Sequence, residues 1–107
     1  MIDITYHRKF HRVTIKGHAH SAELGRDLIC AAASALVYTL AENVNALHLS
    51  GAAKNTIVQM REGDAEICCD AHRKMCSVAT LVYDTVCRGF EMLQEHYPEH
   101  VRYTVMG

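Results

Sequence analysis

Residues 12–45 read RVTIKGHAHSAELGRDLICAAASALVYTLAENVN, and this stretch contains both periodicities from which the fold is built. Val13 and Ile15 alternate with polar residues, which is the pattern of a half-buried β-strand. Residues 27 to about 45 are rich in alanine and leucine and contain no glycine or proline, which predicts a helix. Residues 19–26 follow neither period and include a glycine, so we expect a loop that connects the strand to the helix.

The rest of the chain repeats the same two patterns. Alternation predicts strands at residues 2–6, 55–60, 65–70 and 101–105, and helical spacing predicts a second helix over residues 72–96. The two middle strands are joined by a turn at residues 61–64, where Gly63 supplies a positive φ. The expected apolar helix faces are Ile29, Ala33, Leu36, Val37, Leu40 and Val44, then Val78, Val82, Val86, Phe90 and Leu93.

The element order is therefore β-β-α-β-β-α-β. Two similar ββα halves and a closing strand predict an α+β fold in which both helices pack on one face of a sheet. We find no linker and no low-complexity segment, so residues 1–107 are expected to form a single compact domain.

Composition limits the classes of function. Half of the 107 residues are hydrophobic, which predicts an ordered globule. The formal net charge is -1, and a chain without a basic field is not expected to bind nucleic acid by neutralising phosphates. The chain also has eight histidines, which would make it cationic below about pH 6.5.

Cysteine usage and the N-terminal sequence predict the compartment. The chain has five cysteines, an odd number, and they lie within apolar elements. Charged residues interrupt the first ten positions, so no signal peptide is expected. No apolar run approaches the roughly 20 residues that span a bilayer, so no membrane segment is expected either. We therefore expect a cytoplasmic protein with free thiols.

Cys30 is the first candidate for chemistry. With Asp27 as the N-cap, Cys30 would lie in the first turn of the helix, where the helix dipole favours a thiolate. Asp27, Cys30 and Ser34 are spaced to lie on one helix face. The negative charge of Asp27 opposes a thiolate, and the sequence does not decide between the two effects. From its position alone, Cys30 is more often expected to be a small apolar residue of an alanine-rich helix.

A histidine base is available at the end of the preceding strand. His18 follows Gly17, which has no side chain and lets backbone or substrate approach closely. His20 competes for the same role, and spacing alone does not choose between them. Because the chain has five cysteines and eight histidines, 5 × 8 = 40 such pairs are conceivable.

Two other groups of residues have simpler readings. Cys68, Cys69, His72 and Cys76 could be imagined as a zinc site, but they lack paired C-x-x-C knuckles, and successive strand residues point to opposite faces. We therefore expect no metal and no cofactor, and assign these cysteines as buried thiols. Tyr38, Tyr83, Tyr97 and Tyr103 are expected to pack in the core.

The segments GHA at residues 17–19 and GRDLICAAAS at residues 25–34 closely resemble the signature of the ribosomal-processing cysteine proteases, the Prp or YsxB-like family. The length and the element order agree, so the resemblance covers the whole chain. It implies a cysteine endopeptidase, a hydrolase, with Cys30 as nucleophile and His18 as its base. It favours His18 over His20. Gly17, Asp27 and Ser34 match further motif positions, which implies support of the site or of substrate binding.

The resemblance also implies a substrate. Members of this family remove the N-terminal extension of large-subunit ribosomal protein number twenty-seven, with cleavage after a Phe-Phe pair, and they are typically homodimers. We therefore expect a ribosomal protein precursor as the peptide substrate, a role in ribosome biogenesis, and a homodimer that contacts neither nucleic acid directly nor membrane. The alternative is a non-catalytic ribosome-associated binding or assembly module in which Cys30 has no chemical role.

Overall fold

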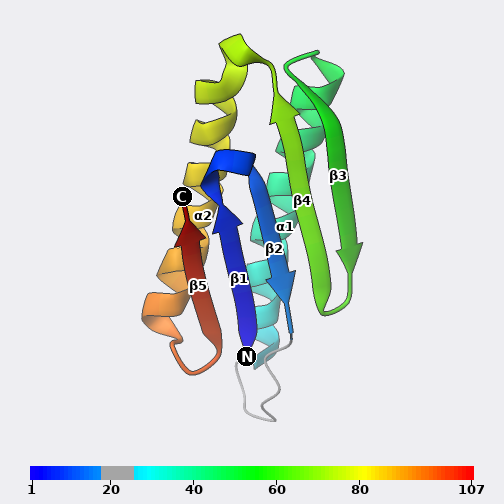
Figure 1. Cartoon of the computed structure of the whole chain (residues 1–107). Helices are drawn as coiled ribbons and strands as arrows, with labels where there is room; N and C mark the ends of the chain where they lie inside the picture. Colours follow the sequence, from blue (N-terminus) through cyan, green and yellow to red (C-terminus); the bar gives the residue numbers. More distant parts are fainter. Residues whose placement is uncertain (18–25) are drawn as a thin grey trace.

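The computed structural model of the chain describes residues 1–17 and 26–107, except the side chains of residues 26 and 27. Five strands form one sheet: β1 (Ile2–His7), β2 (Arg12–Lys16), β3 (Ala53–Arg61), β4 (Asp64–Ala71) and β5 (Val101–Met106). Helices α1 (Arg26–Leu49) and α2 (Cys76–His96) both cover the same face of this sheet (Figure 1). The α+β fold with the order β-β-α-β-β-α-β is therefore confirmed.

The order of strands in the sheet is β3-β4-β2-β1-β5. Strands β1 and β5 are parallel, and every other neighbouring pair is antiparallel. The predicted turn between β3 and β4 is present, with Arg61 paired to Asp64 and Gly63 at a φ of +73°. Strand β2 is the middle strand of the sheet, with β4 on one side and β1 on the other.

The helix boundaries differ from the prediction. Helix α1 begins at Arg26, one residue before the expected cap, and continues to Leu49. Helix α2 begins at Cys76, because residues Arg73–Met75 form a short 3-10 turn first. Asp27 is thus the second residue of α1 and not the residue that precedes it, which changes the depth of Cys30 within the helix.

The face of α1 that contacts the sheet is close to the predicted one. Its buried positions are Ile29, Ala33, Val37, Leu40, Ala41 and Val44, and Leu36 is half-buried. Leu36 packs over Gly89 of α2, where any larger residue would collide with it. The glycine therefore allows the two helices to approach each other closely.

The buried face of α2 is rotated from the predicted one. Val86 and Phe90 are buried as predicted, and Val82 and Leu93 are half-buried. Val78 is exposed instead, and Ala79, Tyr83 and Cys87 join the core. The ring of Tyr83 stacks on that of Tyr6 at a centroid distance of 5.9 Å, and its hydroxyl donates to the carbonyl oxygen of Ile67 at 3.3 Å. An aromatic residue with a partner for its hydroxyl can replace an aliphatic one in the core.

Helix α1 corrects the expectation about apolar runs. Residues Leu28–Leu49 are long and apolar enough to cross a membrane, by length and composition alone. This helix packs against β3, β4 and α2, and the core helix of a folded domain meets the same criterion.

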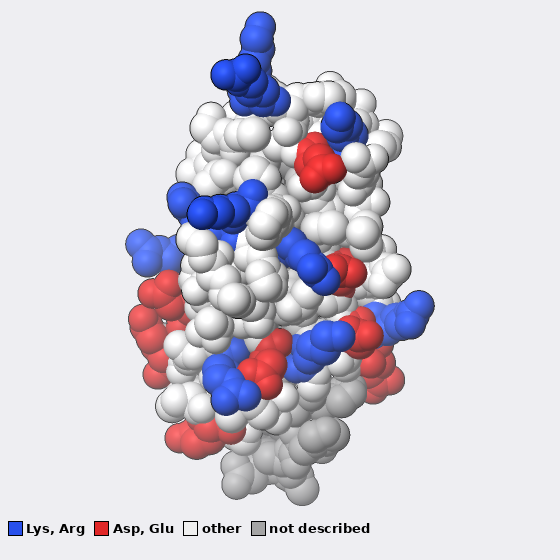
Figure 2. Space-filling model, viewed as in Figure 1, with Lys and Arg blue, Asp and Glu red and all other residues white. Residues whose placement is uncertain are grey.

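The face of the sheet away from the helices is charged, with positive and negative side chains interspersed (Figure 2). Three ion pairs connect neighbouring strands on it: Asp3 with Arg102, Arg12 with Glu66, and Lys16 with Asp64. Such a mixed surface has no single-sign field, as the net charge of -1 suggests.

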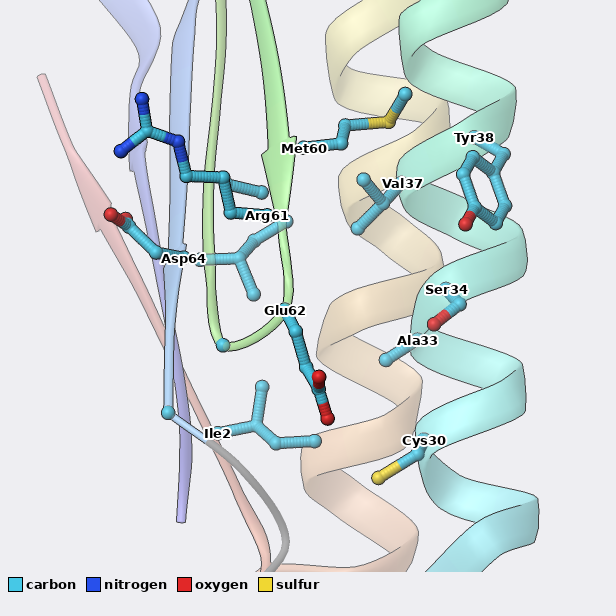
Figure 3. Close-up of a pocket in the computed structure, with 14 residues that line it drawn as sticks. Ile2, Cys30, Ala33, Ser34, Val37, Tyr38, Met60, Arg61, Glu62 and Asp64 are labelled. Carbon is cyan, nitrogen blue, oxygen red and sulfur yellow. The ribbon is translucent and has the colours of Figure 1, made fainter.

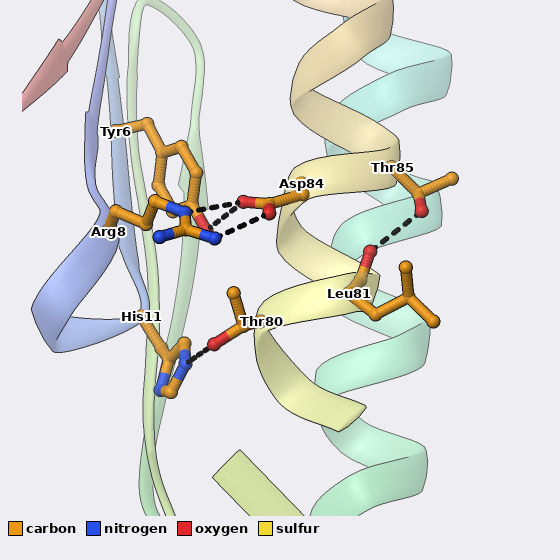
Figure 4. A network of polar contacts seen from close by, with 7 residues as sticks. All are labelled: Tyr6, Arg8, His11, Thr80, Leu81, Asp84 and Thr85. Atoms are coloured by element: carbon orange, nitrogen blue, oxygen red, sulfur yellow. Dashed lines mark hydrogen bonds and ion pairs between the residues drawn. The ribbon is translucent and has the colours of Figure 1, made fainter. Parts of the chain in front are cut away.

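A polar network joins the end of β1 and the turn before β2 to α2 (Figure 4). Arg8 binds both carboxylate oxygens of Asp84, at 3.2 and 3.0 Å, and the hydroxyl of Tyr6 donates to the same carboxylate at 2.8 Å. His11 is 7% exposed, and its Nε2 lies 2.8 Å from the Thr80 hydroxyl. The pKa of Asp84 is lowered, chiefly because Arg8 binds it.

Candidate active site

A cleft of about 490 Å³ separates the N-terminal half of α1 from the β3–β4 turn. One wall is formed by α1 and the other by residues 60–65 around that turn, with Ile2 and Ile15 contributing from β1 and β2 (Figure 3). Cys30 lies in this cleft and its thiol is directed toward the opposite wall. A cleft of this size can hold several residues of an extended peptide.

The position of Cys30 in α1 differs from the expected one. It is the fifth residue of the helix, just beyond the first turn of 3.6 residues. The influence of the helix dipole falls off within that first turn. Cys30 therefore gains less from the helix dipole than its place in the sequence suggests, and its reactivity depends more on the other groups that face the thiol.

The other four cysteines lie in different environments. Cys69 and Cys87 are buried, and burial raises their pKa, that of Cys87 to about 12. Burial also raises the pKa of the half-buried Cys68. Cys76 is exposed at the start of α2, so its predicted burial is wrong, and it lines no described cleft. Cys30 alone among the five combines a half-buried side chain with a place in the cleft that contains Gly17.

Five residues of α1 line the cleft, and three of them follow one another at intervals of four residues. These three are Cys30, Ser34 and Tyr38. Eight residues of helix span about 12 Å, which is the length of three to four residues of an extended strand. Tyr38 is 59% exposed, so its predicted core role is wrong. Tyr83 has that role, while Tyr97 is exposed as well.

The strand end that leads to His18 is firmly held. The amide of Gly17 donates to the carbonyl oxygen of Gly63 at the tip of the β3–β4 turn, at 2.9 Å. Gly17 has a φ of +93°, and a Cβ at this position would collide with the carbonyl oxygen of Met1. Glycine is therefore required here both by backbone conformation and by space. This contact ties the turn to the segment that precedes His18.

The charged residues of the opposite wall are arranged unequally. Arg61 and Asp64 point away from α1, and Asp64 forms an ion pair with Lys16 at 2.9 Å. Glu62 points into the cleft, toward the level of Cys30 (Figure 3). The sequence indicates only that Glu62 lies in a turn, because no local pattern shows that this turn faces α1.

The predicted site residues divide into two groups. Gly17, Cys30 and Ser34 lie together in the cleft. His18 and His20 lie outside the described residues, as does the side chain of Asp27. Their distances to Cys30 therefore remain predictions.

The zinc alternative gains no support from the described residues. Among the side chains that the structure describes, in residues 1–17 and 28–107, no three histidine, cysteine or acidic groups come together as metal ligands. Cys69 faces the core, whereas Cys68 lies on the other face of β4, as alternation in a strand requires.

Residues 1–102 match the model of the family described as cysteine protease Prp. The chain belongs to this family. It is thus a cysteine protease by family, and the ribosomal-processing resemblance of the 17–34 segment is confirmed at the level of the family. No curated protein matches the sequence.

Solved structures share the Prp fold. The crystal structure of SMU.848 from Streptococcus mutans is 28% identical, with a TM-score of 0.69, over 98% of this chain and 91% of that one. Two structures of the ribosomal processing protease Prp from Staphylococcus aureus, one with a substrate peptide and one with a covalently linked product peptide, are 24% identical. Each has a TM-score of 0.69 over 98% of this chain and 97% of its own. At that identity the likeness establishes the common fold.

Proposed function

We propose that this Prp-family protease cuts a peptide bond with Cys30 as the nucleophile and His18 as the general base. The observation that carries the proposal is the half-buried thiol of Cys30, which faces an open cleft long enough for an extended peptide. Gly17 lines the same cleft, and His18 is the next residue in the chain. A nucleophile and a base that approach one cleft from two elements are the usual apparatus of a thiol protease.

The proposed reaction has two stages. His18 accepts the proton of the Cys30 thiol, and the thiolate attacks the carbonyl carbon of the scissile bond. The carbon–nitrogen bond then breaks, and the protonated His18 gives its proton to the departing amine. Water attacks the resulting thioester, loses a proton to His18 and releases the carboxylate product, which restores the thiol. Backbone amides near the N-terminus of α1 would stabilise the oxyanion of each tetrahedral intermediate.

Gly17, Asp27 and Ser34 are proposed as supporting residues. The hydrogen bond between Gly17 and Gly63 fixes the backbone that leads into His18. Ser34 lies one helical turn beyond Cys30 on the same cleft wall, where its hydroxyl can bond to the backbone of an extended substrate. Asp27 is in the first turn of α1, where a carboxylate is favoured by the helix dipole.

The proposed substrate is the N-terminal extension of large-subunit ribosomal protein number twenty-seven, cut after a Phe-Phe pair. Two observations support it. The S. aureus relative is a ribosomal processing protease that has been seen with a substrate peptide. The cleft beside Cys30 also has an apolar lining, including Ile2, Val37 and Met60, which suits phenylalanine side chains.

We also propose a cytoplasmic homodimer that uses no cofactor and contacts neither nucleic acid nor membrane. The helical layer leaves large apolar side chains exposed, among them Leu28 and Leu81, which are 68% and 67% exposed. Burying such side chains against a second copy would remove apolar surface from water. Light scattering at micromolar concentration tests this proposal, because a monomeric mass would contradict the homodimer.

The activity is tested with a peptide that contains the Phe-Phe junction. We expect the wild type to cut it after the second phenylalanine, and Cys30→Ala and His18→Ala to lose this activity. Cys76→Ala is the matched control, because Cys76 is exposed away from the cleft, and it should cut at the wild-type rate. The non-catalytic binding module predicts that the wild type binds the peptide no better than Cys30→Ala does and cuts it no faster. The family match does not favour that alternative.

A further inference from the structure

Glu62 is the charged side chain that enters the cleft from the wall opposite Cys30. Of the three charged residues that line the described cleft, Arg61 and Asp64 point away from α1. The charge of Asp64 is also balanced by Lys16. Among the described side chains, which exclude those of residues 26 and 27, no hydrogen bond or ion pair to the Glu62 carboxylate is found. The described cleft therefore presents a negative charge to its contents.

The backbone that carries Glu62 is held in place. Arg61 and Asp64 are paired across the turn, so only Glu62 and Gly63 form its tip. The Gly63 carbonyl accepts a hydrogen bond from Gly17 at 2.9 Å, which fastens this tip to the end of β2. A charged side chain on a fixed backbone, with no partner among the described residues, is suited to recognise a ligand group of opposite charge.

We propose that Glu62 is a specificity-determining residue that selects a lysine or arginine side chain of the peptide substrate close to the scissile bond. The proposal rests on the proposed protease function of the same cleft. The level of Glu62 is nearer to Cys30 than to Tyr38, so the residue it meets lies within a few positions of the bond that is cut (Figure 3). With the Phe-Phe pair on the acyl side, the nearest variable side chains are those that follow the junction. Glu62 therefore selects for a basic residue on the leaving side.

The test compares peptides that keep the Phe-Phe junction and carry lysine, glutamine or glutamate, in turn, at each of the four positions after it. For the wild type we expect kcat/KM at the most responsive position to be about fivefold higher with lysine than with glutamine, and about tenfold higher than with glutamate. Glu62→Gln should reduce the lysine preference to less than about twofold, and Glu62→Lys should reverse it. The preference should also weaken as salt is added.

Glu42→Gln is the matched control. It removes the same charge from α1, twelve residues beyond Cys30, which is about 18 Å along the helix. At that distance salt screens the charge, so this variant should keep the full lysine preference.

The outcomes separate this proposal from the protease function. Equal cutting of the lysine and glutamate peptides by the wild type at all four positions would overturn the role of Glu62 and leave the protease intact. If Glu62→Gln lowers kcat/KM by the same factor for every peptide, the specificity role would also be overturned, because Glu62 would then act through the catalytic groups. If no peptide is cut, the affinities of the same peptides for the Cys30→Ala variant test the role of Glu62 instead. Tighter binding of the lysine peptide, lost in Cys30→Ala with Glu62→Gln, supports the proposal, and equal binding overturns it.

Discussion

The two ends of strand β2 are built in opposite ways. His11 precedes the strand and Gly17 follows it, and both have a positive φ. His11 is buried against Tyr83 at a ring distance of 5.6 Å and bonded to Thr80, so this end is closed by side chains. Gly17 has no side chain and opens onto the cleft that contains Cys30.

The His11 end of β2 contributes to stability, and the Gly17 end contributes to the proposed function. At the His11 end, the polar side chains form hydrogen bonds with one another. The Asp84 carboxylate, for example, accepts hydrogen bonds from both Tyr6 and Arg8. At the Gly17 end, Cys30, Tyr38 and Glu62 face a cleft in place of the core. Substitutions at the first end should therefore affect folding, and substitutions at the second should affect the reaction.

Of the substitutions considered, Tyr83→Ala, at the closed end of β2, should cause the largest loss of unfolding free energy. Tyr83 is fully buried, stacks on Tyr6 and bonds to the backbone of Ile67. Truncating a buried aromatic residue costs roughly 3–5 kcal/mol of unfolding free energy. Urea unfolding of the variant, with Tyr83→Phe as the milder comparison, measures this cost. A loss below 1 kcal/mol would contradict the packing described.

Gly17→Ala should cost less in stability but should also affect the reaction. A Cβ would clash with the Met1 carbonyl, and the φ of +93° is strained for alanine, so we expect a loss of about 2 kcal/mol. The same shift would displace the backbone before His18 and lower kcat. Ser50→Ala, in the exposed turn that follows α1, is a control for a mild surface change. Full activity in a stable Gly17→Ala protein would count against the role given to this end.

Acid should weaken the closed end through His11. Burial, followed by the charge of Arg8, lowers the pKa of His11 below 6.5, while Asp84 and Asp70 oppose this. The unfolded chain therefore takes up this proton first, and stability falls as the pH drops through 6.5 and below. His11→Asn should flatten this dependence between pH 7 and 5, as measured by urea midpoints. The lowered pKa of Asp84 contributes only near and below pH 3.8, outside this window.

Tyr38→Ala should have the smallest effect on stability, within about 0.5 kcal/mol, because the side chain is mostly exposed. Its effect should be seen in the reaction instead. Loss of the aromatic ring at the far end of the α1 wall should raise KM severalfold for peptides that extend three or four residues from the scissile bond. A shorter peptide should show no difference. An unchanged KM for the long peptide would remove Tyr38 from the binding surface.

The sequence predicted the elements well because their periodicities are local properties. Alternation along residues 2–6 and 65–70 and the glycine of the β3–β4 turn depend on neighbouring residues only. The parallel pairing of β1 with β5 joins the two ends of the chain, and no local pattern encodes it.

The site was predicted only in part, for the same physical reason. Cys30, Gly17 and Ser34 could be found because they lie in one continuous motif. Glu62 and Tyr38 could not, because their place in the cleft depends on how the β3–β4 turn packs opposite α1. Tyr38 was assigned to the core because helical spacing does not distinguish the edge of a buried face from a cleft wall.

The central claim is that Cys30, in its cleft, is the nucleophile. A peptide chloromethyl ketone that ends in Phe-Phe tests this directly, because it alkylates a thiol that is positioned and activated for attack. We expect peptide mapping by mass spectrometry to find one adduct, on Cys30, and none on the more exposed Cys76. Reaction at Cys76 at an equal or higher rate, or no adduct on Cys30, would contradict the claim.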